Sequence, residues 1–199
     1  AEYRLSTEAL YPAAVFDLKA AIRWMRANAK KYGINANKIT ALGFSAGGQL
    51  AALLGTTNGL SGFEGNAGNP QFSSKVNAIV DLDGTTAFIH PESGEGDDVK
   101  SISAATYWFG YQKAQNPTLW NEAGALNHVD KNTPPILFIN SSVDRMHAGR
   151  DDMRRKLDGL GIYSEVQSFP DDPHTFALFN PWFDPMVNHI IAFLRKTFK

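Results

Sequence analysis

One serine in this chain stands in a pattern typical of a nucleophile. Ser45 is the centre of Gly43-Phe44-Ser45-Ala46-Gly47, a G-x-S-x-G sequence. The apolar run 39–44 precedes it and the helix formers 49–54 follow it, so the pattern falls at a strand-to-helix corner. A sharp turn there would present the serine hydroxyl above a sheet, and the flanking glycines remove side chains that would clash. An ordinary strand–glycine turn–helix corner is the alternative interpretation.

The residue after the serine adds a second chemical feature. Ala46 would open the helix, and amides at a helix N-terminus point to where negative charge develops on an attacked carbonyl oxygen. A serine hydroxyl is too weakly acidic to attack an ester alone, and needs a base and a third group that orients the base. The pattern therefore predicts that a histidine and an acid lie elsewhere in the chain.

The elements that must position these groups alternate along the chain. Apolar runs at 39–44, 76–82 and 136–140 predict strands, and 163–169 is expected to be the last of four. Amphipathic patterns predict helices from Pro12 to Lys31, over 150–160 and at the C-terminal end. This alternation indicates one α/β domain over 1–199, with a mainly parallel sheet flanked by helices.

Composition limits the functional classes. The 199 residues are 43% hydrophobic, enough for one domain core, and the formal net charge of -1 indicates neither a nucleic-acid nor a membrane partner. No apolar run reaches the length of a membrane span. The chain has no cysteine, which excludes disulfides, thiolate metal sites and a cysteine nucleophile.

Two further segments have alternative interpretations. The acidic run 92–98 invites a calcium site, but it lacks the regular spacing of a known loop, so we expect a solvated loop, no metal and no cofactor. Tyr107 and Trp108 lie in a short helical piece, 103–109. They are either core residues or a wall that stacks on a sugar or aryl group of a substrate.

The pattern resembles a known family. The segments that carry the likeness are Tyr3-Arg4-Leu5-Ser6, Pro12-Ala13, Asp17, Ala20-Ala21, Trp24, Tyr32-Gly33-Ile34 and Gly43-Phe44-Ser45-Ala46-Gly47-Gly48. They resemble the α/β-hydrolase esterases, most closely the carbohydrate-type branch with acetyl xylan and feruloyl esterases. Such enzymes carry a His-Gly-Gly-Gly-type loop upstream of the Tyr-Arg-Leu-Ser segment, which supplies a second oxyanion donor. These 199 residues contain no such loop.

The resemblance implies an acid in the loop after the strand 136–140, where Asp144 matches. The alternative is a turn-capping aspartate paired with Arg145. The other aspartates that could serve are Asp81, Asp83, Asp151 and Asp152. In this fold the chain order is serine, acid, histidine.

The base is expected after the last strand, where His174 lies in a proline-rich loop. His147, only three residues from Asp144, is the rival. Of the other histidines, His90 and His128 precede Asp144, and His189 is inside the closing helix.

The resemblance therefore implies a serine ester hydrolase for short acyl groups, above all acetyl, on plant cell-wall polysaccharide such as xylan, in a secreted or periplasmic bacterial protein. The expected site is Ser45, Asp144 and His174, with the Ala46 amide as oxyanion donor and Tyr107 and Trp108 against the substrate. A non-catalytic binding module and a serine peptidase are the alternatives. Because the usual neighbour of strand 39–44 is missing here, we also expect an apolar sheet edge, which a second copy or an N-terminal segment would cover.

Overall fold

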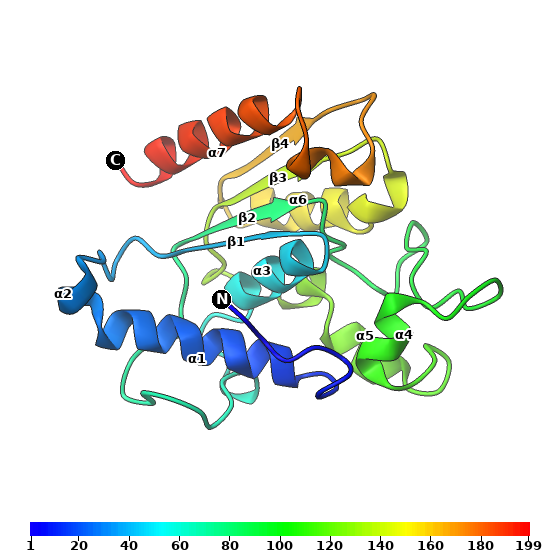
Figure 1. Cartoon of the computed structure of the whole chain (residues 1–199), viewed down its shortest axis with the longest axis horizontal. Helices are drawn as coiled ribbons and strands as arrows, with labels where there is room; N and C mark the ends of the chain where they lie inside the picture. Colours follow the sequence, from blue (N-terminus) through cyan, green and yellow to red (C-terminus); the bar gives the residue numbers. More distant parts are fainter.

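The computed structural model describes residues 1–199 and contains one sheet of four parallel strands between helices (Figure 1). The strands are β1 (Thr40–Phe44), β2 (Ala78–Leu82), β3 (Ile136–Asn140) and β4 (Ser164–Ser168), and they lie side by side in that order. In the register of the sheet, Leu42 lies opposite Val80, and Val80 lies opposite Leu137. The α/β class and the four expected strands are confirmed.

Each strand residue faces one of two apolar layers, because side chains alternate along a strand. On one face of the sheet, residues of β2 and β3 pack against helix α7 (Phe183–Thr197). These are Ala78, Val80, Leu82, Leu137 and Ile139, and they meet Met186 and Phe193 of the helix. The other face, with Ile79, Ile136 and Phe138, packs against α1 (Ala13–Ala27), α3 (Ala46–Thr56) and α6 (Arg150–Gly159). Both faces of the central strands β2 and β3 are buried, which explains the continuous apolar runs of these two strands.

The other three α-helices, α2, α4 and α5, are short. The predicted helix from Pro12 to Lys31 is divided at Asn28 into α1 and α2 (Ala29–Tyr32), and Gly33 ends it with a φ of 66°. Helices α4 (Ala104–Phe109) and α5 (Pro117–Glu122) lie beyond the carboxyl ends of the strands (Figure 1). Four 3₁₀ turns, η1 (Ser61–Phe63), η2 (Ala125–His128), η3 (Asp144–His147) and η4 (His174–Leu178), complete the chain. None of the helices has the length and apolar character needed to cross a bilayer.

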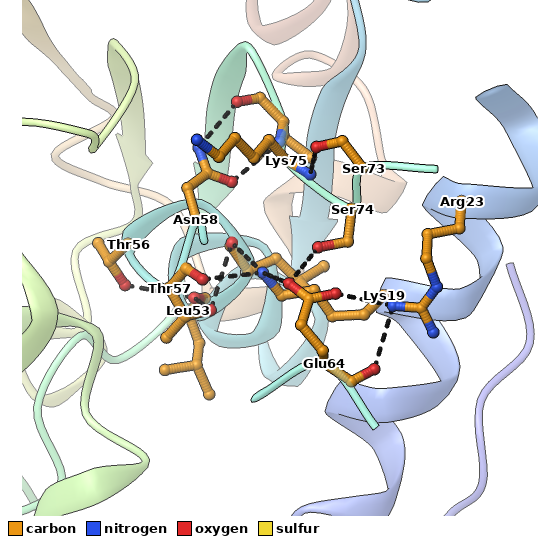
Figure 2. A network of polar contacts seen from close by, with 12 residues as sticks. Lys19, Arg23, Leu53, Thr56, Thr57, Asn58, Glu64, Ser73, Ser74 and Lys75 are labelled. Atoms are coloured by element: carbon orange, nitrogen blue, oxygen red, sulfur yellow. Dashed lines mark hydrogen bonds and ion pairs between the residues drawn. The ribbon is translucent and has the colours of Figure 1, made fainter. Parts of the chain in front are cut away.

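A buried polar network joins α1 to α3 and to the loop after it (Figure 2). Lys19 is fully buried and donates to the carbonyl oxygens of Leu54 (3.2 Å) and Thr57 (3.1 Å), at the end of α3 where carbonyls lack helical partners. Arg23 donates to the Glu64 carboxylate at 2.8 Å. Burial lowers the pKa of Lys19 to about 8, although the charge of Glu64 opposes this change.

Strand β1 is an edge of the sheet and pairs with β2 alone. Leu42, at its centre, exposes 52% of its surface. The expected apolar edge is therefore present in the described chain.

Candidate active site

Ser45 lies on a sharp turn between β1 and α3, with a φ of 57° and a ψ of -119°. A non-glycine residue with positive φ is strained, by about 1–3 kcal/mol, and such strain is typical of functional sites. The turn needs its first glycine, because a Cβ on Gly43 would lie 2.1 Å from the carbonyl oxygen of Gly47. The amide of Ser45 donates to the carbonyl oxygen of Leu82 at 2.8 Å, which fixes the turn to β2.

His174 and Ser45 come together although they are far apart in the sequence. The Nε2 atom of His174 lies 2.8 Å from Ser45 Oγ, within hydrogen-bond distance. His174 begins η4. Its ring stacks on that of Phe44, with 4.9 Å between ring centroids and 28° between planes, so the last residue of β1 holds the imidazole in place.

The carboxylate on the other side of His174 belongs to Asp83 and not to Asp144. Asp83 Oδ2 lies 2.6 Å from His174 Nδ1. Asp144 is exposed at the start of η3 and makes no hydrogen bond or ion pair with His174. The expectation for Asp144 is therefore corrected on geometric grounds: η3 leaves its side chain in solvent, while the turn after β2 directs Asp83 inward.

The turn after β2 holds Asp83 in a buried, hydrogen-bonded place. Asp83 has a φ of 56° and no exposed surface. Its Oδ1 accepts from the Ser141 amide at 2.9 Å, and its Oδ2 accepts from the Ser141 hydroxyl at 2.6 Å. Burial alone would raise the pKa of Asp83, but His147, Ser141 and His174 outweigh it and hold this pKa below its ordinary value. The carboxyl is therefore an anion at neutral pH.

Asp81 stabilises the same turn by a hydrogen bond with its backbone. It is fully buried, and its Oδ1 accepts from the Gly84 amide at 2.8 Å. Burial first, and then the charge of Asp83, raise the pKa of Asp81 well above its ordinary value, although the Gly84 amide opposes this. Asp81 thus shapes the turn through the Gly84 amide and makes no hydrogen bond or ion pair with His174.

The other histidines and aspartates considered from the sequence lie in different settings. His147 Nε2 is 3.3 Å from Asp83 Oδ1, in ion-pair range but without a well-aligned hydrogen bond. Asp151 pairs with Arg150, and Asp152 pairs with Arg155 and His90, on or beside α6. His128 contacts the Glu122 carbonyl oxygen, and the His189 ring faces Phe169.

A cavity of about 350 Å³ opens beside Ser45, within the usual size range of ligand sites. Nine of its 16 lining residues are hydrophobic. The lining consists of Tyr3, Arg4, Leu5, Ser6, Thr7, Ser45, Ala46, Gln49, Leu50, Thr85, Phe88, Glu95, Ala104, Ala105, Trp108 and Met146. The cavity therefore joins the nucleophile to a mainly apolar wall built from the first residues of the chain, α3 and α4.

Only one of the two aromatic residues considered from the sequence lines the cavity. Trp108 lines it and packs edge-on against Tyr11, with 5.0 Å between ring centroids. Tyr107 points elsewhere and is 58% exposed. The acidic run 92–98 contributes Glu95 to the cavity wall, and no three metal-binding side chains gather there or elsewhere.

The parallel sheet with a serine turn after β1 and a histidine after β4 defines an α/β-hydrolase fold, and solved structures agree. A bifunctional GH43-CE protein of Bacteroides eggerthii superposes with a TM-score of 0.82 at 29% identity, covering 98% of this chain and 28% of that one. The truncated form of a carbohydrate esterase from gut microbiota superposes with a TM-score of 0.79 at 28% identity, covering 98% and 72%.

Within this fold, residues 1–149 match the family described as BD-FAE, and the chain belongs to that family. Esterase LipC of Mycobacterium tuberculosis is 28% identical over 158 residues, which are 72% of this chain and 35% of LipC. The versiconal hemiacetal acetate esterase of Dothistroma septosporum is 26% identical over 195 residues, 89% of this chain and 56% of the relative. The chain thus spans about a third to a little over half of these relatives.

Proposed function

We propose that this chain is a serine carboxylic-ester hydrolase whose catalytic residues are Ser45, His174 and Asp83. The observation that carries the proposal is one continuous chain of contacts: 2.8 Å from Ser45 Oγ to His174 Nε2, and 2.6 Å from His174 Nδ1 to Asp83 Oδ2. These are the roles of nucleophile, base and orienting acid in acyl transfer. The esterase names of the relatives LipC and versiconal hemiacetal acetate esterase support the same class.

The proposed reaction begins with attack of Ser45 Oγ on the acyl carbon, while its proton passes to His174 Nε2. The buried charge of Asp83 stabilises the imidazolium that forms. The imidazolium then gives this proton to the leaving alcohol oxygen as the ester C–O bond breaks, which leaves an acyl-serine. Water, activated by His174 in turn, attacks the acyl carbon, and the acid departs while the proton returns to Ser45.

The negative charge of the tetrahedral intermediate needs hydrogen-bond donors. We assign one donor to the Ala46 amide, because Ala46 begins α3 directly after the nucleophile and lines the cavity. The backbone amides of Tyr3, Ser6 and Thr7, which line the same cavity, are candidates for a second donor, whereas the amides of Arg4 and Leu5 already donate to Asp17 and Glu8.

For the substrate we propose short acyl esters, with acetyl groups on a polysaccharide such as xylan as the favoured case. The cavity is mainly apolar and of moderate size, and Trp108 offers an aromatic face of the kind on which sugar and aryl rings stack. The printed descriptions of two solved neighbours, a GH43-CE protein and a carbohydrate esterase, support a carbohydrate ester.

The test compares the wild type with Ser45→Ala and with Ser61→Ala, an exposed serine in η1, on acetyl and long-chain esters and with a fluorophosphonate probe. We expect Ser45→Ala to lose on the order of 10⁴-fold or more in turnover and to resist labelling, because the nucleophile is gone. Ser61→Ala should behave as the wild type, and the acetyl ester should react faster than the long-chain ester. No labelling of any of the three proteins would favour a non-catalytic binding module, and equal labelling of all three would contradict Ser45 as the nucleophile.

A further inference from the structure

A second imidazole contacts the carboxylate that we assign as the catalytic acid. The two oxygens of Asp83 face different histidines: Oδ2 lies 2.6 Å from His174 Nδ1, and Oδ1 lies 3.3 Å from His147 Nε2. The mechanism above uses only the first contact. His147 ends η3, and its side chain is 15% exposed.

The polar groups around His147 leave its Nε2 without another partner. That nitrogen is buried and has no well-aligned hydrogen bond. A second buried carboxyl, Asp172 in the loop before η4, also has an Oδ2 without a partner, and the charges of Asp83 and His147 both act on its pKa. Burial, and then the charge of Asp83, raise the pKa of Asp172 above its ordinary value, whereas the Ser142 amide and a charged His147 lower it.

The other charged groups near this turn are engaged elsewhere. Within η3, Arg145 reaches Glu95, with 3.5 Å between Nη1 and Oε1, and Asp144 is exposed. On α6, Arg150 donates to Asn140 at 2.9 Å and pairs with Asp151. His147 therefore shares the carboxylate of Asp83 with the imidazole of His174, and Asp172 is a second acidic group that interacts with it through charge.

We propose that His147 is a positioning residue for Asp83 and a proton-sensitive switch on the catalytic acid. Neutral His147 leaves the full negative charge of Asp83 to the His174 imidazolium. Protonated His147 forms an ion pair with Asp83 and places a second positive charge on the same carboxylate. This inference rests on the proposed function, because it assigns the acid role to Asp83.

The parameter kcat/KM compares the free enzyme and free substrate with the transition state, and this comparison sets the direction in which the pH profile should change. The free enzyme is the reference, and the transition state carries a positive charge on His174. A proton already on His147 opposes that charge, so kcat/KM falls when either imidazole is protonated. The fall of kcat/KM towards low pH, the acid limb of the profile, therefore reports protonation of both histidines together. Removing the ionisable group at 147 leaves one protonation that lowers the rate, and the acid limb moves to lower pH.

The test measures kcat/KM against pH for the wild type, His147→Gln and His90→Gln, with each profile normalised to its own plateau. His90 is the matched control, because its imidazole contacts Asp152 at 3.3 Å and does not contact Asp83. On the acid limb we expect the normalised rate of His147→Gln to be about twofold or more above that of the wild type, since one of the two protonations that lower the rate is removed. His90→Gln should follow the wild type.

A limb that stays in place or moves to higher pH in His147→Gln would overturn the proposal, even if the plateau falls, because a purely structural role lowers the rate at all pH values alike. If His147→Gln does not fold, ring resonances of the wild type give the second measurement. We expect the His147 ring to titrate over the acid limb, and a ring that stays neutral there contradicts the switch. The Ser45→Ala comparison separates this failure from failure of the proposed function.

Discussion

At the scale of single residues, the acid of the site is set by how two aspartates leave their strands. Asp83 turns inward with a φ of 56° and reaches His174, whereas Asp144 starts η3 in solvent. Asp83 also accepts hydrogen bonds from the amide and the hydroxyl of Ser141. Its buried charge is therefore compensated by donors that orient it toward the imidazole, as a catalytic acid requires.

We predict that Asp83→Asn lowers kcat by on the order of 10³–10⁴-fold, because the amide removes the charge and favours the wrong imidazole tautomer. Asp144→Asn, the same chemical change at the rival position, should stay within about twofold of the wild type. Steady-state kinetics on the acetyl ester, with circular dichroism as a check of folding, measure both. Loss in Asp144→Asn with activity kept in Asp83→Asn would return the acid role to Asp144.

The sequence alone is sufficient to predict the contact between Ser45 and His174, and the contact is present at 2.8 Å. The serine is marked by its glycines, and the histidine by its place after the last strand. The acid is harder to predict, because Asp83 and Asp144 both follow strands whose carboxyl ends meet at one edge of the sheet. Only the backbone of the Asp81–Gly84 turn decides between them. The doublet of Asp81 and Asp83 after an apolar strand was the available signal.

At the scale of elements, β2 and β3 are the most predictable strands, because their apolar runs are buried throughout, whereas β1 and β4 are partly exposed. The short pieces are less so. The division between α1 and α2 at Asn28 has no proline or glycine to mark it, and η4 is a 3₁₀ turn in a loop that the prolines predict to be irregular. Such single turns depend on tertiary contacts, here the burial of Phe176 beneath His174's loop.

The attachment of α1 to α3 gives a prediction about stability. The pKa of Lys19 is lowered to about 8 in the folded chain, from 10.5 when exposed. Between these values the unfolded chain binds more protons than the folded chain, so the free energy of unfolding rises with pH from about 8 to 10.5. The full change is on the order of 3 kcal/mol.

We therefore expect the wild type to gain stability relative to Lys19→Met, by on the order of 1–3 kcal/mol, between pH 7.5 and pH 10. Urea unfolding at both pH values measures the difference, and Lys131→Met, at an exposed lysine, is the control. A difference between the wild type and Lys19→Met that does not change with pH would show that Lys19 is equally charged in both states.

At the scale of the whole molecule, the sheet is covered on both faces but open at β1. This strand pairs with β2 alone, so its outer amides and carbonyls have no partner strand. Leu42 lies at the centre of this edge and is 52% exposed. An open apolar edge of this kind is a template for pairing with another strand. The edge also borders the site, because β1 leads directly into Ser45.

We propose that the 199-residue chain self-associates through β1. A charged side chain introduced at the centre of this edge should then prevent the association. Sedimentation velocity from micromolar to higher concentrations should show association of the wild type and a monomer for Leu42→Lys, because a lysine on an edge strand disfavours pairing. Val99→Lys is the control, since Val99 is an exposed apolar residue outside the sheet. A wild type that stays monomeric throughout, or a Leu42→Lys variant that associates as the wild type does, would refute pairing at this edge.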